Sequence, residues 1–210
     1  EFRRVLFRSF FITYRMIKKM KRNLTGVLLM GLIMGACNHT PKEGAYHLRG
    51  VVTNEKLEGR TIYLRDAMEG VVRYDSTIVS EGRFVFNGKV TAPQVRELFI
   101  QENDSDRFPV TLPVVLEPGE INAKIGDIVL VEGTGLNEEM MQTLMALDEF
   151  RGRDFTGKEI NEIKEAFGGF VLEQIVKHAG SPVGNYLYEA YQNKLSENQQ
   201  TEARKTLGIG

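Results

Sequence analysis

Residues 80–90 read SEGRFVFNGKV, and this stretch indicates a β-hairpin. Phe84 and Phe86 alternate with the residues around them, which is the two-residue period of a strand that buries one face. The Ser-Glu-Gly that precedes them is typical of a hairpin turn, because glycine adopts backbone angles that other residues avoid. The stretch therefore predicts that the chain around it folds as antiparallel β-structure.

Segments with the same character lie on both sides of this stretch. Pro118-Gly119 suits a tight turn between two of them. Pro113 is expected on an edge strand or at a bulge, because proline has no N–H to donate to a neighbouring strand. Short strands spaced this closely predict an antiparallel β-sandwich or open barrel over about residues 45–133. The other expected strands are 46–52, 61–66, 71–79, 95–102, 110–117, 120–125 and 128–133.

After Gly133 the apolar period becomes helical, and residues 134–210 are expected to form a helical segment, with helices over about 136–207. Asn137 is expected to cap the first helix. Thr156 and Glu159 have capping-box spacing and predict the start of the second. Ser181-Pro182 predicts the third start, and Ser196 with Gln199 the fourth. The apolar faces expected for the first two helices are Leu136, Met140, Leu144, Leu147 and Phe150, then Ile160, Ile163, Phe167, Phe170, Val171 and Ile175.

The charge of the chain is divided unevenly. The 210 residues sum to −1, but residues 1–36 contain eight basic residues and one acidic residue, so residues 37–210 carry a net charge of −8. Nucleic-acid phosphates require a basic surface. We therefore expect no nucleic-acid partner.

Residues 16–36 have the pattern of a signal peptide: four basic residues precede an apolar run that ends in small residues. The apolar run, 24–36, is shorter than the roughly 20 residues that a transmembrane helix needs. Met34-Gly35-Ala36-Cys37 resembles the lipobox of bacterial lipoproteins. That resemblance implies cleavage between Ala36 and Cys37, alkylation of the Cys37 thiol by diacylglycerol and acylation of the new amine.

The predicted role of Cys37, which is the only cysteine, is therefore anchoring to membrane lipid. A secreted protein cut nearby and an uncleaved anchor are the alternatives. Residues 1–15 fit no targeting pattern and are interpreted as a non-native leader before a start at Met16 or Met20. Residues 37–44 form a short polar tether. The expected location is the cell envelope, with the protein lipid-anchored at the outer membrane and facing the periplasm.

Four stretches carry a resemblance to a known family: HLRGVV, TIYLRD, YDSTIVSEGRFVFNGKV and LEPGEINAKI. In the third, Asp-Ser follows a strand, and Gly-x-Phe-x-Phe-x-Gly follows, with Pro93 next. Residues 46–133 resemble a domain of unknown function found at the N-terminus of Bacteroidetes lipoproteins, where it usually precedes a thioredoxin-like (AhpC/TSA) domain. The helices with AGSPVGNYLYEA resemble the linker of those proteins. No CxxC motif is present, so the resemblance implies either a stand-alone member or the front part of a longer protein.

The sequence contains no convincing catalytic or metal-binding pattern. His39, His47 and His178 lack metal-ligand spacing, and His178 is expected to interact with the last carbonyls of its helix. Asp75-Ser76-Thr77 lacks a nearby histidine and nucleophile-elbow glycines, so a polar strand edge or turn is expected. ENDSDR at 102–107 lacks the glycine and closing glutamate of an EF-hand loop. We expect no catalytic residue, metal or cofactor.

Tyr186, Tyr188 and Tyr191 crowd one short helix, and tyrosine is enriched at protein interfaces. They predict a docking surface for an envelope protein partner. The leading hypothesis is a non-catalytic, membrane-anchored binding or scaffold module. The alternatives are the anchor half of a thiol–disulfide oxidoreductase or peroxiredoxin-like lipoprotein, and a small-ligand or glycan-binding β-domain, although the chain has no Trp to stack sugars.

Overall fold

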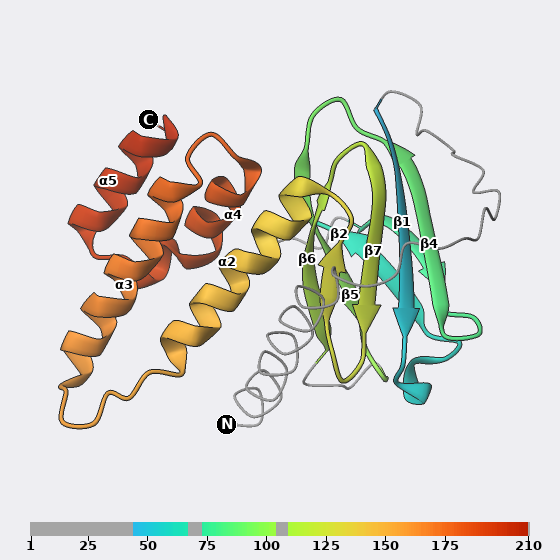
Figure 1. Ribbon diagram of the computed structural model, residues 1–210, viewed down its shortest axis with the longest axis horizontal. Helices are drawn as coiled ribbons and strands as arrows, with labels where there is room; N and C mark the ends of the chain where they lie inside the picture. Colours follow the sequence, from blue (N-terminus) through green and yellow to red (C-terminus); the bar gives the residue numbers. More distant parts are fainter. Residues whose placement is uncertain (1–43, 67–72, 104–108, 210) are drawn as a thin grey trace, which may run out of the picture.

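The computed structural model describes residues 44–66, 73–103 and 109–209 (Figure 1). The expected leader, signal peptide and most of the tether, including Ala36 and Cys37, lie outside the described residues. In the described part, two β-sheets are followed by a group of helices. The expected fold class, a sandwich-like β-region followed by a helical segment, is confirmed.

Each sheet has four strands. Sheet A has the order β4 (Arg83–Lys89), β1 (Ala45–Val52), β7 (Gly119–Ile125), β8 (Leu130–Glu132). Sheet B has the order β3 (Arg73–Ile78), β2 (Thr61–Arg65), β5 (Gln94–Ile100), β6 (Val110–Leu116). Neighbouring strands are antiparallel, with one exception: β1 and β7 run parallel. A short 3₁₀ helix, Glu55–Leu57, lies between β1 and β2.

Two aromatic rings lie over glycines of the facing strand in the β1–β4 pair. Gly50 is opposite Phe84 in the register, and a Cβ added at Gly50 would lie 1.9 Å from the Phe84 ring. Tyr46 is opposite Gly88, where an added Cβ would lie 2.5 Å from the Tyr46 hydroxyl oxygen. Each glycine thus leaves the space that a large buried ring fills. This packing accounts for Phe84 and Gly88 of the Gly-x-Phe-x-Phe-x-Gly pattern, and its first glycine, Gly82, adopts a positive φ of 64° in the turn before β4.

Four α-helices follow the sheets in the described chain: α2 (Gly135–Arg151), α3 (Ile160–Lys177), α4 (Pro182–Tyr191) and α5 (Glu197–Leu207), with a 3₁₀ helix, Gln192–Lys194, after α4. Helix α2 contacts both β8 and β6. In Figure 1 it lies between the sheets and the other helices, while β4 is on the side of the sandwich remote from them.

Helix α2 contributes to two hydrophobic cores. Met141 is buried with the residues between the sheets, whereas Met140 is buried with α3, α4 and the outer face of β6. Leu144 packs against both cores. Val115 of β6 belongs to the helical core, although its neighbours Val114 and Leu116 belong to the sandwich core. The helical segment is therefore packed on the sheets as part of the same folded unit.

The prediction that Asn137 caps α2 is wrong. Thr134 is the N-cap residue, and Asn137 is fully buried within the first turn. Its side-chain oxygen accepts a hydrogen bond from the backbone N–H of Val115 at 2.8 Å, and its Nδ2 donates to the Val115 carbonyl oxygen at 2.7 Å. Strand β6 is an edge strand, as predicted from Pro113, and Asn137 pairs with the edge that the strand leaves free.

The other helix starts agree with the sequence in two of three cases. Ser181 caps α4 by accepting from the Val183 N–H, and Ser196 forms a capping box with Gln199. Helix α3 begins at Ile160 rather than at Thr156, with Glu159 and Glu162 forming the capping box. Thr156 instead donates its N–H and hydroxyl to Asp154, and Ile160, expected on the buried face, is 62% exposed.

Candidate functional site

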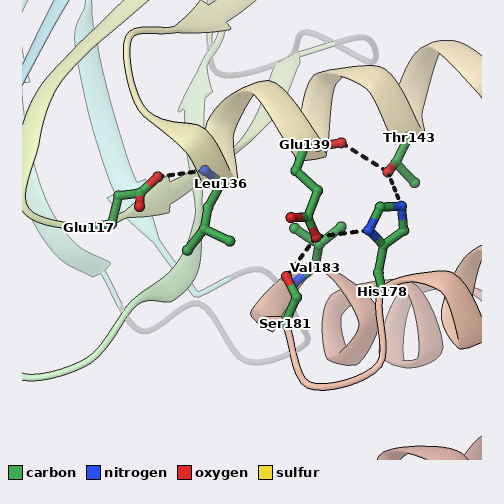
Figure 2. Close-up of polar contacts among 7 residues, drawn as sticks. All are labelled: Glu117, Leu136, Glu139, Thr143, His178, Ser181 and Val183. Carbon is green, nitrogen blue, oxygen red and sulfur yellow. Dashed lines mark hydrogen bonds and ion pairs between the residues drawn. The ribbon is translucent and has the colours of Figure 1, made fainter.

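A serine, a histidine and a glutamate meet where α3 ends and α4 begins (Figure 2). Ser181 Oγ donates to Glu139 Oε1 at 2.7 Å, and His178 Nδ1 lies 2.8 Å from the same oxygen. On the other side of the ring, His178 Nε2 lies 3.0 Å from Thr143 Oγ1. Glu139 and Thr143 belong to α2, so the cluster links α2 to the α3–α4 connection.

The geometry of this cluster differs from that of a catalytic triad. In a serine–histidine–acid triad the histidine lies between the other two groups and takes the serine proton. Here the carboxylate lies between them, and Ser181 Oγ is also occupied by the Val183 N–H at 3.2 Å. His178 is 8% exposed and both of its ring nitrogens have partners. The expectation that His178 interacts with the helix-end carbonyls is wrong, because its ring contacts the side chains of α2.

A second carboxylate fixes the beginning of α2. Glu117 Oε1 accepts a hydrogen bond from the backbone N–H of Leu136 at 2.8 Å (Figure 2). The first N–H groups of a helix have no partner within the helix, and an acidic side chain there also interacts favourably with the helix dipole. Glu117 precedes β7, so this bond ties the α2 N-terminus to the sandwich.

An open groove runs between the β4–β5 turn and the N-terminus of α4. One part has a volume of about 490 Å³ and is lined by Pro93, Leu136, Gly180, Ser181, Pro182, Asn185 and Leu207. The adjoining part, of about 390 Å³, is lined by Asp66, Pro93, Gln94, Val95, Arg96, Pro182, Asn185, Tyr186 and Glu189. Both parts share Pro93, Pro182 and Asn185, so they form one surface depression.

Arg96 is the basic residue in the lining of the groove, and it is held by its neighbours. Its Nη1 pairs with Asp66 Oδ1 at 3.1 Å, and its Nη2 donates to Gln94 Oε1 at 2.9 Å. Its guanidinium lies 5.2 Å from the centre of the Tyr74 ring. Arg96 Nε is buried and has no partner within the described residues. Most of its hydrogen-bonding capacity is therefore used inside the fold.

A buried acid lies on the outer face of sheet B, beneath α4. Glu97 is 9% exposed, and Arg65 Nη2 donates to its Oε2 at 3.1 Å. Burial raises the pKa of the Glu97 carboxyl, and Arg65 opposes this effect by stabilising the charged form. Burial also holds the pKa of Tyr186 well above its ordinary value, with smaller contributions from Tyr191 and Glu97. These groups are part of the contact between α4 and the sheet.

The three tyrosines do not form the docking surface predicted from the sequence. Tyr188 is 7% exposed and lies in the helical core, and Tyr186 is half-buried against that core. Tyr191 accepts a hydrogen bond from Arg151 Nη2 at 3.0 Å and packs against the Phe167 ring. The prediction of a shared exposed surface is wrong, because Tyr188 is buried in the helical core and Tyr186 and Tyr191 are partly buried against it.

The other histidines and the other polar motifs of the sequence do not come together in one site within the described residues. His47 Nδ1 lies 2.6 Å from Asn87 Oδ1 on sheet A, and Ser76 is exposed on the edge strand β3, as expected. His39 and most of 102–107 lie outside the described residues. In those that are described, no group of three or more His, Cys, Asp or Glu is arranged to hold a metal. No helix among them is long and apolar enough to span a bilayer.

Comparison with known families gives one match. A family model described as "Domain of unknown function (DUF4369)" matches residues 46–140. No curated protein and no solved structure matches the chain. Residues 46–140 thus match a domain of unknown function, as the sequence motifs indicated. The match extends past the last strand to include Asn137, which bonds to β6, and Met140, which is buried with Val115 of β6.

The local sequence pattern does not predict the contacts that join the helices to one another and to the sheets. The Glu139–His178–Ser181 cluster joins residues about 40 positions apart, and no local spacing signals it. The groove likewise combines the β4–β5 turn with three helices. The only available signal was polar residues at positions of α2 that face the core, namely Asn137 and Thr143.

Proposed function

We propose that the chain is a lipid-anchored lipoprotein of the bacterial cell envelope and that its folded body is a non-catalytic binding or scaffold module. The observation that carries the proposal is Met34-Gly35-Ala36-Cys37, which follows a basic segment and an apolar run. Several acyl chains, each contributing about 0.8 kcal/mol per buried CH₂, hold a protein firmly on a membrane. Cys37 is eight residues before the first residue of β1, so the body would stay close to that membrane.

Two features of the fold support a non-catalytic role. The serine and histidine that share a carboxylate are both used to hold helices together. The groove beside Pro182 is open, and Arg96, the basic residue in its lining, is already paired with Asp66. A surface depression on a firmly packed two-part body suits the binding of a partner. The cell-envelope location follows from the anchor, and the outer-membrane, periplasm-facing placement is part of the same proposal.

The experiment is expression of the chain from Met16 in a bacterial host, with membranes separated from soluble protein by sedimentation. We expect wild-type protein in the membrane fraction and incorporation of a labelled fatty acid. Cys37→Ser removes the thiol and is expected to abolish both. Met34→Leu is the matched control, because leucine is the usual residue at that position of the lipobox, and it should keep both. Membrane association that Cys37→Ser leaves unchanged would contradict the anchoring proposal.

A further inference from the structure

The outward face of sheet A gathers cations around two exposed valines. The register places Val85 opposite Arg49, and it places Val51 opposite both Arg83 and Lys124. Val51 and Val85 are each 47% exposed, and the three cations are exposed as well. Since alternate residues of a strand point to opposite faces, these five side chains share the face turned away from the sandwich core.

The charge of this face is opposite to that of the chain that carries it. We call Arg49, Val51, Arg83, Val85, Lys89 and Lys124 the basic face. Glu120 and Glu132 are the acidic residues on the same side of sheet A, which leaves it with a net charge of +2. Residues 37–210 together carry −8. This face is thus net positive, although the protein that carries it is net acidic.

Most of these cations are free to meet a ligand. Arg49 lies 3.5 Å from Glu120, but the two side chains are 62% and 37% exposed, so the pair is weak. Arg83, Lys89 and Lys124 make no ion pair within the described residues. The helices pack on the side of β6 and β8, away from β4 (Figure 1). The basic face is therefore open.

The basic face also lies on the sheet that the anchor would reach. Strand β1, which crosses the middle of this face, begins eight residues after Cys37. An extended chain spans at most about 3.3–3.6 Å per residue, so the start of β1 stays within about 30 Å of an anchored Cys37. Guanidinium and ammonium groups bind phosphate oxygens through charge-assisted hydrogen bonds. Small exposed apolar residues between them fit the headgroup layer of a bilayer.

We propose that the basic face binds the anionic phosphate headgroups of the membrane and orients the protein with sheet A toward the bilayer. The orienting role rests on the proposed function only through the anchor. A membrane fits better than an acidic peptide added along the edge of β4. Such a peptide would contact mainly the side chains of that one strand, whereas these cations are distributed over β4, β1 and β7.

The test does not depend on whether cells acylate Cys37. Cys37 is the only cysteine, so residues 37–210, which contain every residue of both buried cores, can be coupled through it to a maleimide lipid. Vesicles are made of phosphatidylcholine alone or of an equal mixture with phosphatidylglycerol. A water-soluble acylating reagent then modifies exposed lysines, and mass spectrometry measures each site. Lys164 and Lys205, exposed on the helical segment, are internal controls.

We expect labelling of Lys89 and Lys124 to fall about fivefold on the phosphatidylglycerol vesicles, the effect of about 1 kcal/mol per cation at an anionic surface. Lys164 and Lys205 should not change. The double variant Arg49→Glu/Arg83→Glu should restore labelling of both face lysines, and so should high salt. Equal labelling of Lys89 and Lys124 on the two kinds of vesicle overturns the proposal. If, in addition, an acidic peptide protects them in solution, the face belongs to a protein partner.

Discussion

The amide of Asn137 makes two hydrogen bonds with Val115, one to each of its backbone polar groups. The amide thereby forms the two backbone hydrogen bonds that a neighbouring strand would form with Val115 at the free edge of β6. Edge strands that expose such groups invite pairing with other chains. Asn137 satisfies both of these groups at Val115, so this position of the edge is closed to such pairing and the helical segment is joined to the β-domain.

Replacing Asn137 tests this junction. Asn137→Ala leaves a buried N–H and a buried carbonyl without partners, and each costs about 1–3 kcal/mol, so we expect a loss of about 2–6 kcal/mol in the free energy of unfolding. Urea unfolding followed by circular dichroism measures it. Asn198→Ala, at an exposed site on α5, is the control and should change stability by less than about 0.5 kcal/mol. A loss no larger than that of the control would contradict the assigned role.

The Phe84–Gly50 contact predicts that alanine is not tolerated at Gly50. The new methyl group would overlap the buried Phe84 ring, and such overpacking costs about 1–3 kcal/mol. In the Phe84→Ala background the same substitution should cost much less, because the ring is gone. Gly135→Ala, where nothing lies within 4 Å, should be neutral or slightly stabilising. Additive effects of the two substitutions in a double-mutant cycle would show that the ring does not require the glycine.

The cluster at the α3–α4 connection predicts that Ser181→Ala lowers the stability of the protein and that Ser181 is not an activated nucleophile. Ser181→Ala removes the cap of α4 and the bond to Glu139, and we expect a cost of about 1–2 kcal/mol. A fluorophosphonate probe, which reacts with activated serines, should not label Ser181 in the wild-type protein. Labelling that Ser181→Ala and His178→Ala both abolish would show that the cluster is a catalytic site instead.

The raised pKa of Glu97 predicts how the stability of the folded protein changes with pH. The folded protein holds a proton on Glu97 at pH values where the unfolded chain has lost it, so protonation of this group favours folding. Its contribution to stability is complete below about 4.5, the ordinary pKa, and is lost as the pH rises through the raised value. The unfolding free energy of wild type relative to Glu97→Gln should therefore fall as the pH rises from about 4 to neutrality.

A titration of the Glu97 carboxyl carbon by NMR gives the pKa directly. Because Arg65 favours the charged form, Arg65→Gln should raise this pKa further. Asp154 is the contrasting group, since it is exposed and its pKa is lowered by hydrogen bonds from Thr156. A Glu97 midpoint below 4.5 would contradict the dominant effect of burial.

Local patterns in the sequence predicted the elements well and their junctions poorly. Alternation around Phe84 and Phe86 identified the hairpin strand, and Ser181-Pro182 identified a helix start, because both depend on neighbours in sequence. The local pattern predicts that Asn137 caps a helix, and it fails there because the contact that Asn137 makes is with Val115, which comes 22 residues earlier. The parallel pairing of β1 with β7 was missed for the same reason. Tyrosine occurs both at surfaces and in cores, so the residue type alone does not predict that Tyr188 is buried. Its burial depends on the packing of α4 against α3.

The intact mass of the native protein, extracted from membranes with detergent, tests the central claim most directly. A mass that equals residues 37–210 plus acyl groups is the predicted result, and it would establish an anchored module with the body described above. A mass that retains the residues before Cys37, or that lacks acyl groups, would contradict the anchor. A mass larger by a whole domain would show that this chain is the front part of a longer protein and would contradict a purely non-catalytic role.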